Sequence, residues 1–133
     1  MAAVVVDTHG AIWYLLGDEA LSTSARETLE GAARLGDPAY VSSISLVEVL
    51  YLVEKGRLPS TALDRLSGAL AQPDSGFVIA PLDMGVALAI RRVSRQIVPD
   101  MPDRIIAATA LHLNIPLITR DREIRKAGVR TIW

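Results

Sequence analysis

Five short stretches of this chain are almost wholly apolar, and this feature limits the possible folds more than any other. They cover residues 3–6, 39–41, 77–80, 116–119 and 129–132. Short apolar runs rich in valine and isoleucine are typical of buried strands. Apart from Thr119 in the fourth run and Arg130 and Thr131 in the last, these runs have no polar residue to turn toward water, so both faces of the sheet they form must be covered. The pattern therefore predicts a mainly parallel sheet buried between layers of helices.

Segments with helical patterns separate the apolar runs. Glycines at 17 and 56 end two of them, and the spacing Ser45–Glu48 has the form of a capping box at the start of a third. Strands that alternate with helices favour the α/β class. The predicted helices cover residues 9–16, 22–35, 45–55, 60–71, 83–96, 103–112 and 122–127.

Length and composition exclude several classes of protein. A chain of 133 residues is expected to form a single domain over residues 1–133, and 50% hydrophobic residues exclude intrinsic disorder. The absence of cysteine excludes a disulfide framework and thiolate metal sites. The first residues lack the basic and apolar regions of a signal peptide, and no apolar run is long enough to span a membrane. We therefore expect a cytoplasmic protein without a membrane partner.

The net charge of −1 hides an uneven distribution of charged residues. Residues 1–90 carry eleven acidic and five basic side chains, whereas residues 91–133 carry four acidic and nine basic ones. This asymmetry indicates either a polyanionic partner or solvated helix faces that carry arginine.

Four carboxylates stand at the ends of predicted elements. Asp7 directly follows the first strand, Asp121 follows the fourth, Glu48 lies in the first turn of the third helix, and Asp103 opens the helix before the fourth strand. In open α/β sheets, ligands bind beyond the carboxyl ends of the strands, so these four side chains could converge. Each also has a simpler interpretation, as a helix cap or a partner of the helix dipole.

Four acids in one cleft repel each other unless a cation lies among them. Carboxylate oxygens without cysteine favour a hard ion such as Mg²⁺ or Mn²⁺. Such an ion can polarise a phosphoryl oxygen and activate water. The chain has no Walker-type loop, no G-x-G-x-x-G and no G-x-S-x-G motif, so phosphodiester hydrolysis is the reaction class most consistent with the residues.

Four segments in order resemble the PIN-domain nucleases, and most closely the VapC toxins of type II toxin–antitoxin modules. They are V-V-V-D-T-H at 4–9, V-S-S-I-S-L-V-E at 41–48, D-M-P-D-R-I-I-A-A-T-A-L at 100–111 and P-L-I-T-R-D at 116–121. The resemblance implies a three-layer sandwich around a mainly parallel five-stranded sheet. It implies that the protein is a Mg²⁺-dependent endoribonuclease that inhibits translation or growth. It also implies an RNA substrate, an antitoxin partner, and a homodimer or a toxin–antitoxin hetero-oligomer.

The resemblance also implies roles for the four acids. Asp7 and Asp103 would be the principal metal ligands, and Asp121 would add a ligand directly or through water. Glu48 would orient the water on the metal or act as a base. Asp100, three residues before Asp103, is expected to be a loop or capping residue.

Weaker predictions concern neighbouring residues. Thr119, and less surely Thr8, would supply hydroxyls that hold a carboxylate or the scissile phosphate. Arg104 suits the RNA backbone, although pairing on the helix surface explains it equally well. Trp13 and Trp133 have the character of packing residues.

Two alternatives stay open at this point. One is a PIN nuclease of RNA processing that has no antitoxin. The other is a non-catalytic α/β module that binds a metal or a basic peptide in an acidic cleft.

Overall fold

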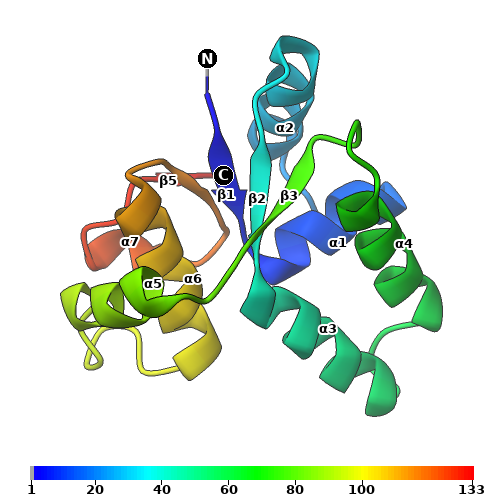
Figure 1. Cartoon of the computed structure of the whole chain (residues 1–133). Helices are drawn as coiled ribbons and strands as arrows, with labels where there is room; N and C mark the ends of the chain where they lie inside the picture. The colour runs from blue at the N-terminus through cyan, green and yellow to red at the C-terminus, as the bar shows by residue number, and fades with distance from the viewer. Residues whose placement is uncertain (1) are drawn as a thin grey trace.

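The computed structural model describes residues 2–133 and contains one five-stranded sheet in which every pair of neighbouring strands is parallel (Figure 1). The strand order is β3-β2-β1-β4-β5. This arrangement confirms the predicted α/β class, and the parallel pairing extends to all five strands. The strands are β1 (Val4–Val6), β2 (Ala39–Ser42), β3 (Phe77–Ala80), β4 (Leu117–Ile118) and β5 (Thr131–Ile132).

Helices cover both faces of the sheet, as the apolar strands require (Figure 1). Val4 and Val6 point into one hydrophobic core and Val5 into the other, and all three are fully buried. The first core is closed by α1 (Thr8–Leu16), α2 (Thr23–Leu35), α3 (Ser43–Glu54) and α4 (Ser60–Ala71). The second is closed by α5 (Met84–Ala89), the 3₁₀ turn η1 (Ile90–Arg92), α6 (Met101–Leu113) and α7 (Arg122–Lys126).

Three predicted helix boundaries are wrong, each for a local physical reason. Helix α6 starts at Met101 rather than at Asp103, because Asp100 is its N-cap and accepts a hydrogen bond from the Asp103 N–H at 3.1 Å. Helix α3 starts at Ser43 rather than Ser45, because Ser42 is its N-cap and accepts a hydrogen bond from the Ile44 N–H at 3.2 Å. The predicted capping box is therefore absent, and Ser45 is a buried residue of the first turn. Helix α5 ends at Ala89 and not near residue 96.

The early end of α5 is held by an arginine from α6. Arg104 donates from Nη2 to the carbonyls of Ile90 at 3.0 Å and Val93 at 2.8 Å, and from Nε to Val93 at 3.2 Å. These contacts satisfy carbonyls that an α-helix would otherwise use, so the chain tightens into η1 and leaves the helix.

The strand order creates a crevice between β1 and β4. From β1 the chain moves to β2 and β3 on one side, and it returns through α5 and α6 to β4 on the other side of β1. The connections that leave β1 and β4 therefore diverge, which is the topology that opens a ligand-binding crevice at the carboxyl ends of strands. No helix within residues 2–133 is long and apolar enough to cross a membrane.

Candidate active site

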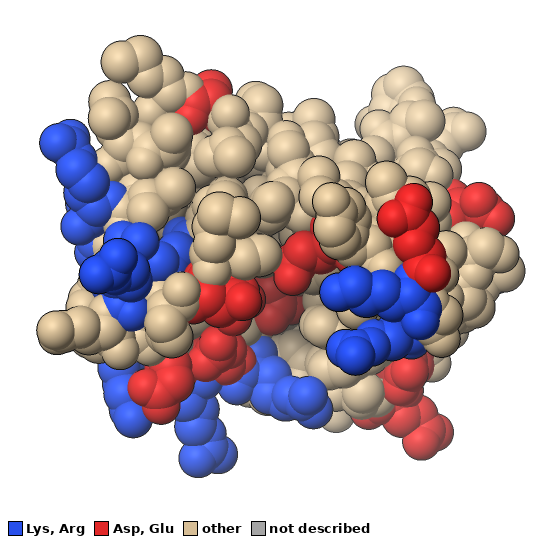
Figure 2. All heavy atoms as spheres, turned by 90° about the horizontal axis from the view of Figure 1, so that it is seen from below, with Lys and Arg blue, Asp and Glu red and all other residues tan. Residues whose placement is uncertain are grey.

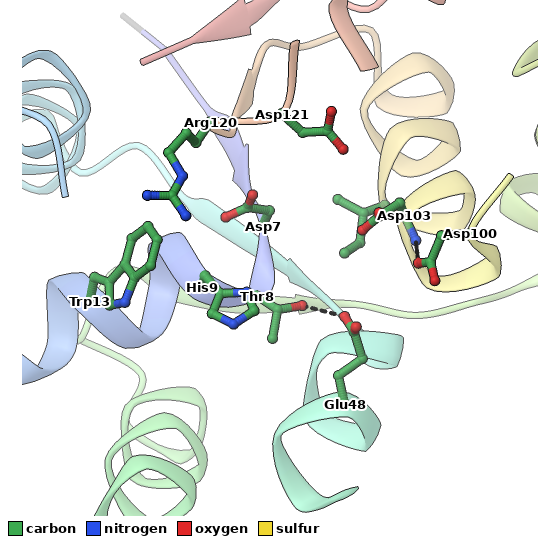
Figure 3. A pocket seen from close by; sticks show the side chains of 10 residues that line it. Asp7, Thr8, His9, Trp13, Glu48, Asp100, Asp103, Arg120 and Asp121 are labelled. Carbon is green, nitrogen blue, oxygen red and sulfur yellow. Dashed lines mark hydrogen bonds between the residues drawn. The ribbon is translucent and has the colours of Figure 1, made fainter. Parts of the chain in front are cut away.

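A cavity of about 430 Å³ lies at this crevice, beyond the carboxyl ends of β1 and β4. Acidic side chains gather in the hollow at the middle of this face, with basic side chains on either side (Figure 2). The close view shows that the carboxylates come from four separate segments and face a shared space (Figure 3). The lining residues are Asp7, Thr8, His9, Trp13, Glu48, Asp100, Asp103, Ile106, Arg120 and Asp121.

Asp7 is held by the start of α1. It is the N-cap, and its Oδ1 accepts a hydrogen bond from the Gly10 N–H at 2.8 Å. A Cβ on Gly10 would lie only 2.8 Å from that oxygen and 3.0 Å from Val6 Cγ2, so the glycine permits this close approach. Burial raises the pKa of Asp7 above its usual value, while hydrogen bonds from Thr119 and Gly10 oppose the shift.

Glu48 is positioned by a hydroxyl network beneath the cavity. The Thr8 hydroxyl lies 2.6 Å from Glu48 Oε1 and 2.8 Å from the Ser45 hydroxyl, and both hydroxyl-bearing residues are buried. This contact orients one carboxylate oxygen of Glu48 and leaves the other for a ligand. Burial raises the pKa of Glu48, the Thr8 hydrogen bond opposes that shift, and the charges of Asp100 and Asp7 add to it.

Asp103 shows the strongest effect of crowding. Burial raises its pKa to about 7, and the charges of Asp100, Asp121, Glu48 and Asp7 contribute in that order. Asp100 is the N-cap of α6 and accepts a hydrogen bond from the Asp103 N–H at 3.1 Å, as expected for a capping residue. Pro102, in the first turn, lacks an N–H that would need a partner there.

Asp121 enters the cavity from the turn after β4. Its Oδ1 accepts a hydrogen bond from the Glu123 N–H at 2.9 Å, which caps α7. The buried Thr119 hydroxyl accepts one from the Asp121 N–H at 3.1 Å. Asp7, Asp121 and Asp100 are thus N-caps and cavity residues at once, so the capping interpretation and the site interpretation are compatible.

Within residues 2–133, no basic side chain forms an ion pair with these carboxylates. Within residues 2–133 the only ion pair joins Lys126 and Glu123 at 3.1 Å, outside the cavity. Arg120 does line the cavity, but its guanidinium rests over the Trp13 ring at 4.9 Å from the ring centre (Figure 3). In the same part of the chain no three acidic or histidine side chains stand close enough to form a ready-made metal-binding group.

Of the residues selected from the sequence, Asp7, Glu48, Asp103, Asp121 and Thr8 line the cavity. Thr119 lies buried beside it and bonds to the backbone of Asp121.

Arg104 does not line the cavity, because its guanidinium is bound to the carbonyls of Ile90 and Val93. Four further polar or aromatic cavity residues were not assigned to the site from the sequence: Arg120, His9, Trp13, which was interpreted as a packing residue, and Asp100, which was expected to be a loop or capping residue. Their signals were present: Arg120 stands inside T-R-D at 119–121, and His9 and Trp13 are four residues apart on one helix face.

The fold and the site together define the class of this protein. It is an α/β protein with an acidic cavity at the crevice between β1 and β4. Residues 4–129 match the family model described as PIN domain. The chain is also 32% identical, over 127 residues, to Ribonuclease VapC22 of Mycobacterium tuberculosis, covering 94% of this chain and 92% of that protein. The chain therefore belongs to the PIN-domain family.

Solved structures share the fold over nearly the whole chain. VapBC2 from Rickettsia felis, bound to a DNA fragment from its promoter, matches with a TM-score of 0.72 and 17% identity over 97% of this chain and 96% of that one. FitAcB from Neisseria gonorrhoeae matches with a TM-score of 0.63 and 25% identity over 96% and 95%. FitAB bound to an IR36 DNA fragment matches with a TM-score of 0.67 and 20% identity over 96% and 92%.

Proposed function

We propose that this protein is a Mg²⁺-dependent endoribonuclease that hydrolyses RNA phosphodiester bonds, and that it is the toxin of a toxin–antitoxin module that inhibits translation or growth. One observation supports this most directly: five carboxylates from four separate segments line one cavity, and none forms an ion pair within residues 2–133. The relative named Ribonuclease VapC22 supports the reaction and its substrate class.

The donor set of the cavity fits a hydrated divalent ion. Carboxylate oxygens are the ligands that Mg²⁺ and Mn²⁺ prefer, and Mg²⁺ keeps several waters while it binds one or two carboxylates. Such an ion therefore does not need three side chains in direct contact with it in order to bind. The raised pKa of Asp103 reflects burial first and then the negative charge of the neighbouring carboxylates, which such a cation would offset. Asp7 and Asp103 would hold the ion, with Asp121 as a further ligand, direct or through water.

A bound divalent ion would polarise a phosphoryl oxygen and stabilise the charge that develops there. Glu48 would orient the attacking water and accept its proton on the oxygen that Thr8 leaves free. The water oxygen would then form the new bond to phosphorus while the bond to the ribose oxygen breaks, and that oxygen would leave with the bonding electron pair and take up a proton from solvent. Thr8 and Thr119 would keep Glu48 and the Asp121 turn in place.

An antitoxin protein is the proposed partner, in a hetero-oligomer or beside a homodimer of this chain. Support comes from the fold shared with the toxin–antitoxin assemblies VapBC2 and FitAB. We also propose that residues 1–133 act as one domain in the cytoplasm.

The test is RNA cleavage by Asp7→Asn and Asp103→Asn variants with Mg²⁺. Loss of one carboxylate should reduce the cleavage rate by roughly 100-fold or more, because it removes a ligand of the cation whose positive charge would stabilise the transition state. Asp83→Asn is the matched control: Asp83 also caps a helix, accepting from the Val86 N–H at 2.9 Å, but it lies outside the cavity. Asparagine still caps, so this control should keep full activity.

Full activity in both cavity variants would refute the assignment. If the wild-type protein cuts no RNA and calorimetry detects no Mg²⁺ binding, the chain is a non-catalytic binding module instead.

A further inference from the structure

A second cavity, about 480 Å³ in volume, adjoins the acidic one, and nothing in the proposed reaction accounts for it. The two cavities share Arg120 and Asp121. The second is completed by Arg122 and Arg125 of α7, by Thr119 and Thr131, and by Trp133. Its size is within the range of about 300–1,000 Å³ found for small-ligand pockets. We call it the basic cavity.

The arginines of the basic cavity differ from four of the five other arginines in residues 91–133. Arg91, Arg92, Arg104 and Arg130 donate to backbone carbonyls and so have structural partners, and Arg95 lies outside both cavities. By contrast, the side chains of Arg120, Arg122 and Arg125 are exposed and form no hydrogen bond or ion pair within residues 2–133. Their charge is therefore available to a ligand.

The acid in the basic cavity does not cancel that charge. Asp121 directs Oδ1 to the start of α7, and no arginine nitrogen lies within salt-bridge distance of it in the described chain. Three cations beside one engaged carboxylate make a site for an anionic ligand. The arginine fork matches the oxygens of a phosphate group in particular.

We propose that the basic cavity binds the phosphodiester backbone of the RNA strand next to the cleaved bond. The shared wall of Arg120 and Asp121 makes the two cavities one continuous path. An RNA strand with its scissile phosphate among the carboxylates would extend from there along Arg122 and Arg125. An acidic protein segment fits less well, because only a nucleic-acid strand would place a phosphodiester in the acidic cavity and further phosphates beside the arginines at the same time. This inference rests on the proposed function.

Two tryptophans at the junction provide a direct readout. Trp13 lines the acidic cavity and Trp133 the basic one, with ring centres 5.9 Å apart, and they are the only tryptophans in the chain. Intrinsic tryptophan fluorescence therefore reports on this junction alone. RNA that occupies the path should change it.

The experiment measures binding of a fluorescein-labelled, single-stranded RNA 12-mer of mixed sequence to the Asp7→Asn protein, by anisotropy and by tryptophan fluorescence. Adding Arg122→Ala and Arg125→Ala should weaken binding by about 10-fold. It should also reduce the slope of log Kd against log salt concentration by about 1.4, the value for two lost phosphate contacts on a single strand. Adding Arg34→Ala and Arg57→Ala instead removes the same charge from exposed positions outside both cavities, and should change Kd less than about 2-fold.

Equal effects of the two double variants would overturn the proposal. So would arginine-dependent binding of a poly-glutamate peptide without RNA binding, because the partner would then be a protein. A failure of the proposed function has a different signature: RNA binds through Arg122 and Arg125, but the wild-type protein with Mg²⁺ does not cut it. If RNA is cut and the two arginines have no effect, only the present inference fails.

Discussion

The acidic and basic cavities have similar volumes and a common wall, yet they hold their charges in different ways. The acidic cavity fixes its half-buried carboxylates with short hydrogen bonds, such as Gly10 to Asp7 and Thr8 to Glu48. The basic cavity presents exposed arginines that form no hydrogen bond within residues 2–133, although Arg120 rests over the Trp13 ring. The contrast teaches that small shifts in geometry should disable the first cavity, whereas the second should respond to the number of charges and to salt.

The largest effect is expected from Gly10→Ala, which tests the geometric side of this contrast. The added methyl would lie 2.8 Å from Asp7 Oδ1 and 3.0 Å from Val6 Cγ2, so the carboxylate must move. A shift of this kind should lower the cleavage rate by about 100-fold. Overpacking should also cost about 1–3 kcal/mol of unfolding free energy, measured by denaturant titration.

Gly68→Ala is the control for this variant. Gly68 lies in the exposed face of α4, and nothing stands within 4 Å of a Cβ added there. Alanine should therefore stabilise the helix by about 0.5–1 kcal/mol and leave cleavage unchanged. A Gly10→Ala enzyme with wild-type activity would show that the position of Asp7 is not critical.

A smaller effect is expected from Thr8→Val, which removes the hydroxyl between Glu48 and Ser45 without changing any charge. Glu48 then loses its orienting donor, so the cleavage rate should fall by about 10-fold. Because a buried hydrogen-bonded pair is broken, unfolding should cost about 1–2 kcal/mol less.

Thr28→Val is the matched control, since Thr28 bonds only to the Ser24 carbonyl of its own helix, at 2.8 Å. Its activity should equal that of the wild type, and its stability should change by less than about 0.5 kcal/mol. Equal activities of the two threonine variants would remove Thr8 from the mechanism.

The same contrast separates what the sequence could predict from what it could not. The apolar runs predicted the parallel sheet because burial on two faces leaves a direct mark on composition, as in Val4–Val6. Asp7, Asp103 and Asp121 were found because each stands at the end of a strand or in the first turn of a helix, which a linear pattern reveals. Glu48 was selected because the expected capping box put the helix start at Ser45, whereas α3 starts at Ser43 and Glu48 is its sixth residue. The hydrogen-bonded acidic cavity was therefore largely predictable.

The basic cavity was not predictable in this way. The structure assigns Arg120 and Arg125 to a cavity and Arg104 to the end of α5. Both assignments depend on distances between segments that are far apart in the sequence. The same applies to the contact of Arg120 with Trp13, which joins the end of β4 to α1. Composition shows only that arginines are abundant after residue 90, and the structure shows which of them have partners.

The smallest expected effect concerns stability against pH, and it sharpens the electrostatic side of the comparison. The pKa of Asp103 is about 7 in the folded protein, against an ordinary value of 3.8. Between these values the folded state holds a proton that the unfolded state has released. The free energy of unfolding of the metal-free protein must therefore fall as the pH rises through this range, and the raised pKa values of Asp7 and Glu48 act in the same direction.

Because Asp103 is half-buried, solvent reduces the effect, and we expect a change of roughly 1 kcal/mol, or about 3–4 °C in Tm. Thermal unfolding in EDTA at about pH 5 and about pH 8 measures it, with Asp103→Asn expected to flatten the difference and Asp83→Asn to preserve it. Mg²⁺ should raise Tm more at the higher pH, where the carboxylates are ionised and can bind it. A metal-free protein that instead gains stability from the lower to the higher pH would show that its carboxylates are not crowded, and the electrostatic argument for a cation in this cavity would fail.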